Sequence, residues 1–119
     1  VGPEVIMGST RLKAGTAQKM VLNMLSSCAM IKLGKTYGNL MVDVRPINQK
    51  LKKRVIDIVQ IATGRTQEAV MATLEAAEGD AKVAIVMLLL DVAAPKARDL
   101  LKEHNGFVKK AVRKYESNC

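Results

Sequence analysis

Residues 48–64 read NQKLKKRVIDIVQIATG, and their apolar side chains have the spacing of a helix with one buried face. The apolar residues Leu51, Val55, Ile58 and Ala62 recur at intervals of three or four positions. Gly64 follows the last of them, and glycine is a residue that commonly ends helices. We therefore expect an α-helix that begins near residue 48, ends at Gly64 and packs one face on a core.

Four more helices are expected after this one, because helix-starting and helix-ending residues alternate along the chain. Thr66 and Asp80 are types that begin helices, Gly79 is a type that ends one, and Pro95 suits a first helical turn. The expected helices cover about 66–79, 80–90, 95–104 and 107–115. Short helices with short connections predict a compact helical module over residues 47–119.

One long helix is expected before this module, from about Thr10 to Leu33, with Gly34 as its C-terminal cap. Its second part, MVLNMLSSCAMI at residues 20–31, is apolar or small on every side. A helix of that kind has to be covered on every side, and the rest of so short a chain is not expected to cover it. We therefore expect the chain to be part of a longer protein, in which upstream residues or a partner subunit provide the cover.

The long helix is expected to be joined to the module by residues 37–46. We predict that Tyr37 to Val44 forms a loop and then a short extended piece, which Arg45-Pro46 ends. Asp43 is expected to be a structural partner of Arg45 or of a backbone N–H group.

The composition limits the classes of function. The chain has 119 residues, is 49% hydrophobic and 3% aromatic, and carries a net charge of +8. A packed core is therefore expected, and the basic balance favours anionic partners. Basic clusters at 50–54 and 109–114 are interpreted mainly as solvated helix faces, and the scarcity of aromatic residues argues against single-stranded nucleic acid. Cys28 and Cys119 form no disulfide framework, so a reducing, cytoplasmic setting is expected, and no apolar run is long enough to span a membrane.

The stretch GSTRLKAGTAQK, residues 8–19, is the strongest candidate for a binding site. It reads as a loop that enters a helix, with Arg11 and Lys13 in the first turn, where the positive end of the helix repels cations. Ser9, Thr10 and the free backbone N–H groups beside them would suit a phosphate. The alternative is an ordinary Ser/Thr cap with two solvated cations.

Other chemistry has little support in the sequence. His104 is the only histidine and is expected to face solvent at a helix end, and Cys28 is expected to be a buried, unreactive thiol, so no metal site is expected. Residues 1–46 contain only two acids, Glu4 and Asp43. Glu4 is a candidate acceptor for a sugar hydroxyl, but a reaction that needs paired carboxyl groups lacks a pair here.

Several segments together resemble the N-acetylmuramic acid 6-phosphate etherases and the related glucokinase regulatory protein. The matching segments are GPE at 2–4, GSTRLKAGTAQK at 8–19, VLNMLS at 21–26, GKTYGNLMVDV at 34–44, AIVML at 84–88 and GF at 106–107. The segment at 8–19 is long and specific. The layout of the module also resembles ubiquitin-associated three-helix folds, but its first loop, residues 64–67, is polar, which disfavours ubiquitin binding.

The resemblance implies a cytoplasmic homodimeric enzyme that cleaves the D-lactyl ether of N-acetylmuramic acid 6-phosphate. Lactate is eliminated and water is added, with glutamates as acid and base and without a metal or cofactor, and N-acetylglucosamine 6-phosphate and D-lactate are the products. It also implies that residues 1–46 end a sugar isomerase-type αβα domain and that 47–119 form a small helical C-terminal domain, so that this chain is mainly α.

The resemblance places the family's catalytic glutamates upstream of the matching segments, so no catalytic residue is expected here and the chain alone is expected to be inactive. The residues expected to bind the amino-sugar phosphate are Glu4, Ser9, Thr10, Arg11 and Lys13. The long apolar helix is expected to form the homodimer, and no contact with nucleic acid or membrane is expected. The alternatives are a non-catalytic sugar-phosphate sensor and, more weakly, a basic module that binds nucleic acid.

Overall fold

The computed structural model describes residues 1–9 and 11–117. Over these residues it is mainly helical, with six helices and one two-stranded sheet, as predicted for the fold class. The chain divides into two compact units, Val1–Lys32 and Leu33–Cys119, which we call the N-terminal unit and the helical unit. Each is described by itself.

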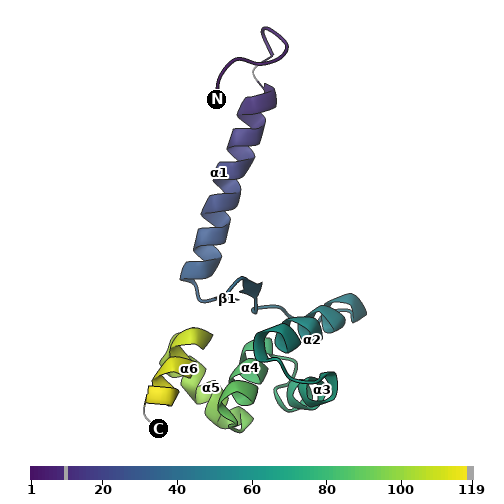
Figure 1. Ribbon diagram of the computed structural model, residues 1–119, viewed down its shortest axis with the longest axis vertical. Helices are drawn as coiled ribbons and strands as arrows, with labels where there is room; N and C mark the ends of the chain where they lie inside the picture. The colour runs from purple at the N-terminus through teal and green to yellow at the C-terminus, as the bar shows by residue number, and fades with distance from the viewer. Residues whose placement is uncertain (10, 118–119) are drawn as a thin grey trace. The chain divides into compact units, whose positions relative to one another are not determined.

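The N-terminal unit consists of an irregular segment followed by the helix α1, Arg11–Lys32. Figure 1 shows α1 as one unbroken helix. Its bounds agree with the predicted helix to within one residue, and Gly34 just beyond it has the left-handed φ of 68° that favours glycine. No residue of α1 is buried, and Cys28, which we expected to be buried, is exposed.

The helical unit begins with a hairpin that the sequence analysis missed. Strands β1, Thr36–Tyr37, and β2, Leu40–Met41, pair antiparallel around Gly38-Asn39, where we had expected a loop and one extended piece. Gly38 has a φ of 58°, which the tight two-residue turn requires. The backbone N–H of Val42 donates to the carbonyl of Lys35 at 3.0 Å and extends the pairing.

Five helices follow, and they begin close to the predicted positions. The helices are α2 Gln49–Thr63, α3 Gln67–Ala76, α4 Ala81–Leu90, α5 Ala94–Glu103 and α6 Val108–Ser117. However, α3 ends at Ala76, before the Gly79 that was expected to end it, and α6 runs to Ser117, past the predicted residue 115. The side chains of Asn48, Thr66 and Asp80 each accept a hydrogen bond from a backbone N–H in the first turn of α2, α3 and α4. Gly64 ends α2 in the left-handed conformation, and Pro95 lies in the first turn of α5.

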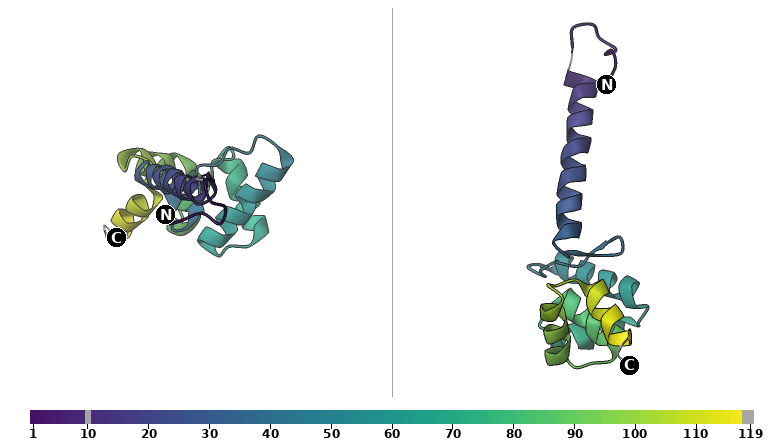
Figure 2. Two further views of the ribbon diagram at one scale, coloured as in Figure 1. Left: turned by 90° about the horizontal axis from the view of Figure 1, so that it is seen from above. Right: turned by 90° about the vertical axis from the view of Figure 1, so that its left-hand side faces the viewer.

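The core of the helical unit is built around α4, which packs against α2, α3, α5 and α6. Figures 1 and 2 show α4 in the middle of this group of helices. Ile85 and Val86 of α4 are completely buried, as are Val59 of α2 and Val70 of α3. Val42 joins this core with 1% of its surface exposed. Residues after Leu33 therefore pack with the helices in this structure, and the predicted domain boundary between 46 and 47 stays a prediction.

Among the described residues, no helix combines the length and the apolar character that a membrane span needs.

Candidate functional site

The predicted anion site at the start of α1 already contains a carboxylate from the chain. The backbone N–H of Lys13, in the first turn of α1, donates to Oε1 of Glu4 at 2.7 Å. The first N–H groups of a helix have no partner within the helix, and the positive end of the helix attracts an anion. Glu4 therefore takes the role that a capping side chain would have, although it lies nine positions before Lys13.

A second hydrogen bond holds the same segment against the helix. Nζ of Lys13 donates to the carbonyl oxygen of Pro3 at 2.6 Å. The other carboxylate oxygen of Glu4, Oε2, is buried and has no hydrogen-bond partner within the described residues. The structure thus brings Glu4 and Lys13 together: Oε1 of Glu4 accepts a hydrogen bond, and Oε2 has no hydrogen-bond partner within the described residues.

Two other predicted residues, Ser9 and Arg11, take no part in this contact. Ser9 is half-buried, and its backbone N–H donates to the carbonyl of Ile6 at 3.1 Å. Arg11 is exposed and forms no ion pair within the part of the chain that the structure describes. Two positions apart on a helix, Arg11 and Lys13 project about 200° from each other, so they do not face one ligand together. Thr10 lies outside the described residues.

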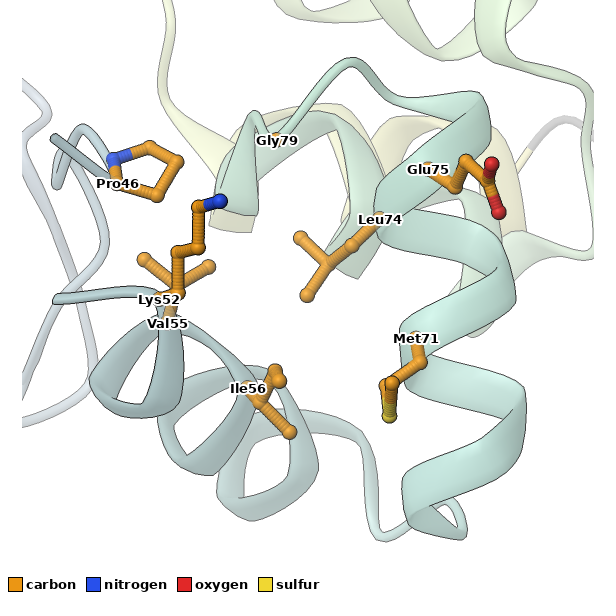
Figure 3. A pocket seen from close by; sticks show the side chains of 8 residues that line it. All are labelled: Pro46, Lys52, Val55, Ile56, Met71, Leu74, Glu75 and Gly79. Carbon is orange, nitrogen blue, oxygen red and sulfur yellow. The ribbon is translucent and has the colours of Figure 1, made fainter. Parts of the chain in front are cut away.

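The helical unit has an apolar pocket that sequence reasoning did not find. The pocket is ≈ 340 Å³ in volume and lies between α2 and α3. Figure 3 shows Val55 and Ile56 facing Leu74 and Met71 across it. The only signal for this pocket in the sequence was Ile56, an apolar residue of α2 that does not belong to the regularly spaced apolar residues that predicted the buried face.

This apolar pocket is suited to binding rather than to acid–base chemistry. Its charged lining residues are Lys52 on α2 and Glu75 on α3. The carboxylate of Glu75 is directed away from the α2 side chains (Figure 3), so the two charged groups do not converge on one point. An apolar group is the ligand that such a lining accepts.

Two sequence-based expectations about polar residues were wrong. Asp43 pairs with Lys35, whose Nζ lies 2.8 Å from Oδ2, instead of with Arg45 or a backbone N–H. The hydrogen bond from Lys35 lowers the pKa of the Asp43 carboxyl below its ordinary value. His104 does not face solvent freely: it is half-buried, and its Nε2 is buried without a partner among the described residues. Within those residues, no cluster of three metal-ligating side chains is present.

The structure defines a mainly helical chain in which the first turn of α1 binds the carboxylate of Glu4. No family model matches the chain. Curated proteins do match it over most of its length. N-acetylmuramic acid 6-phosphate etherase of Cutibacterium acnes is 57% identical over 111 residues, which are 93% of this chain and 36% of that protein.

Two further relatives bear the same name. The protein of Lactobacillus johnsonii is 54% identical over 115 residues, 97% of this chain and 39% of its own length. That of Rubrobacter xylanophilus is 61% identical over 98 residues, 82% of this chain and 33% of its own length. The chain therefore belongs to the N-acetylmuramic acid 6-phosphate etherase family, and it spans about a third of the length of the curated relatives it matches.

Proposed function

We propose that this chain is part of an enzyme that cleaves the D-lactyl ether of N-acetylmuramic acid 6-phosphate. The reaction is elimination of D-lactate followed by addition of water, and it leaves N-acetylglucosamine 6-phosphate. The observation that carries this proposal is the identity of 51–61% to proteins of that name over most of the chain. In this proposal the enzyme is a carbon–oxygen lyase of cell-wall sugar recycling, works in the cytoplasm and needs no metal or cofactor.

The start of α1 supplies one wall of the sugar-phosphate site in this proposal. Ser9, Thr10 and the first backbone N–H groups meet the phosphate, which a helix N-terminus and a nearby cation both favour. Arg11 is the cation that binds it, because Arg11 is exposed while the ammonium of Lys13 is held by the carbonyl of Pro3. The unpartnered Oε2 of Glu4 accepts a sugar hydroxyl, and Lys13 fixes Glu4 through its other oxygen.

The acid and base of the reaction lie outside these 119 residues in this proposal. The N-terminal unit has a single carboxyl side chain, Glu4, and one oxygen of that group is occupied by the backbone of Lys13. An elimination that separates the roles of acid and base needs a second group. The chain by itself therefore binds substrate and does not turn it over.

The apolar length of α1 is covered in the whole enzyme by the rest of a sugar isomerase-type domain and by a second subunit. Met20, Leu22, Met24, Leu25 and Ile31 are each more than half exposed in this chain. Several large apolar side chains exposed on one helix are typical of an interface. The domain division that goes with this proposal is residues 1–46 in the sugar-phosphate-binding domain and residues 47–119 in a helical C-terminal domain.

The test is release of D-lactate from N-acetylmuramic acid 6-phosphate by the whole protein. Arg11→Met removes a charge-assisted hydrogen bond of about 1.5–3 kcal/mol, which predicts a KM about 10- to 100-fold higher. Lys19→Met is the matched control, because Lys19 is an exposed cation about two turns further along α1 and should leave KM unchanged. Tight binding of the sugar phosphate without any lactate would overturn the proposal in favour of a non-catalytic sensor.

A further inference from the structure

A second pocket lies in the helical unit, where the β1–β2 hairpin meets the C-terminal turns of α2 and the first turn of α6. It is ≈ 370 Å³ in volume, and we call it the hairpin pocket. Tyr37, Asn39 and Leu40 come from the hairpin, Ile61 from α2 and Lys109 from α6. Its volume falls in the range of small-molecule sites, which are about 300–1,000 Å³.

The apolar lining of this pocket consists of residues held by the core and of one exposed residue. Tyr37 and Leu40 are half-buried and pack against the core of the helical unit, so the hairpin holds them in place. Ile61 is 69% exposed although it is a large aliphatic residue. Tyr37 is one of only three aromatic residues in the chain, and the other two do not line this pocket.

The polar groups of the hairpin pocket are free to bind a ligand. Lys109 is exposed and has no ion pair within the described residues, whereas Lys114 of the same helix pairs with Glu103 at 3.1 Å and Lys110 lies 4.3 Å from the centroid of the Phe107 ring. Among the residues that the structure describes, none with a carboxylate lines the pocket. The pocket therefore combines one unpaired ammonium with the amide of Asn39 at the hairpin turn and the hydroxyl of Tyr37.

We propose that the hairpin pocket binds a small amphipathic anion, of the class of N-acetylated amino-sugar phosphates. The phosphate pairs with Lys109, Asn39 and Tyr37 form hydrogen bonds with amide and hydroxyl groups, and the acetyl methyl group packs on Ile61 and Leu40. The choice of sugar phosphate rests on the proposed function, and the class of small amphipathic anion rests on the pocket itself. A single aromatic residue does not form the series of stacking surfaces that a nucleic-acid strand needs.

The experiment is a titration of the 119-residue chain with N-acetylglucosamine 6-phosphate, followed by the backbone amide signals in NMR. Saturable shifts at Gly38 and Asn39 are expected. Lys109→Met should weaken this binding about tenfold or more, because it removes a charge-assisted contact. The matched control is Lys102→Met, which removes an exposed cation from α5, outside the pocket, and should leave the binding unchanged.

Two further ligands test whether the phosphate and the N-acetylated sugar are both needed for binding. Inorganic phosphate and unphosphorylated N-acetylglucosamine should each shift the hairpin signals only at much higher concentration than the sugar phosphate. Equal shifts with inorganic phosphate alone would show an adventitious ion and overturn the proposal, as would unchanged affinity in Lys109→Met. A nucleic-acid strand that shifts the same signals more tightly than the sugar phosphate would also overturn it.

The two proposals fail separately. If the whole protein releases D-lactate while the hairpin signals do not move, the hairpin pocket is not a ligand site and the proposed function stands. If the hairpin signals shift and saturate while the whole protein releases no D-lactate, the pocket stands as an anion site and the proposed function is wrong.

Discussion

Gly34→Ala, just before the hairpin, is expected to destabilise the helical unit more than Gly38→Ala in the hairpin turn. Gly34 has a φ of 68°, where an alanine costs about 1–2 kcal/mol of backbone strain. A Cβ built on Gly34 would also lie 3.0 Å from Cδ2 of Phe107 and 3.1 Å from its Cγ. Extra atoms in a packed contact cost about 1–3 kcal/mol, so we expect a total loss of about 2–5 kcal/mol.

The matched control is Gly38→Ala. Gly38 has a similar φ of 58°, but apart from the adjoining residues no described atom lies within 4 Å of a Cβ built there. Only the backbone strain applies, so the expected loss is about 1–2 kcal/mol. The difference between the two variants isolates the contact with Phe107.

Urea unfolding followed by tyrosine fluorescence measures both losses. Tyr37 and Tyr115 are both half-buried in the helical unit, and the chain has no tryptophan to obscure them. In a Phe107→Leu background, the smaller side chain should leave room for the methyl group, and Gly34→Ala should then cost about as much as Gly38→Ala. Equal losses for the two single variants, within about 0.5 kcal/mol, would refute the packing argument.

Three further perturbations of the helical unit have definite expected outcomes. Ile85→Ala removes a completely buried side chain and should cost about 2–5 kcal/mol in urea unfolding, whereas Ile61→Ala at an exposed position should cost less than about 0.5 kcal/mol. Asn48→Ala removes the acceptor of the Leu51 N–H at 2.9 Å and should cost about 1 kcal/mol by the same measurement, and no loss would show that another group caps α2. Because the pKa of Asp43 is lowered in the folded state, its stabilising effect is present above its unfolded pKa and is lost as the pH falls through its folded pKa. Asp43→Asn should therefore be less stable than the wild type near pH 7, and the difference should begin to shrink as the pH falls below about 4 and disappear only below the lowered folded pKa. A difference that stays constant with pH would contradict the assignment.

The starts of α2, α3 and α4 and the end of α2 were predictable because they depend on local chemistry. Asn48, Thr66 and Asp80 each bind an N–H three residues ahead, and Gly64 takes a left-handed φ of 66° at the end of α2. These interactions are complete within four or five residues, so a short stretch of sequence contains all the information they need.

The hairpin was missed because its strands are too short to show an alternating pattern. Each strand has two residues, Thr36–Tyr37 and Leu40–Met41, and the alternation that identifies strands needs about four or more. The two-residue Gly38-Asn39 turn was the available signal, since such turns join paired strands.

The candidate sites depend on contacts between distant residues, and only their composition was predictable. The cations and hydroxyls at the start of α1 indicated an anion, but the hydrogen bond from Lys13 to Glu4 joins residues nine positions apart. The hairpin pocket joins Tyr37 to Lys109 through the packing of α6 on the core. No local pattern identifies either pair.

The most direct test of the proposed function is whether the whole protein that contains this chain releases D-lactate from N-acetylmuramic acid 6-phosphate. We predict D-lactate and N-acetylglucosamine 6-phosphate in equal amounts, with a raised KM in Arg11→Met and an unchanged KM in Lys19→Met. Saturable binding of the sugar phosphate with no D-lactate above the uncatalysed background would contradict it.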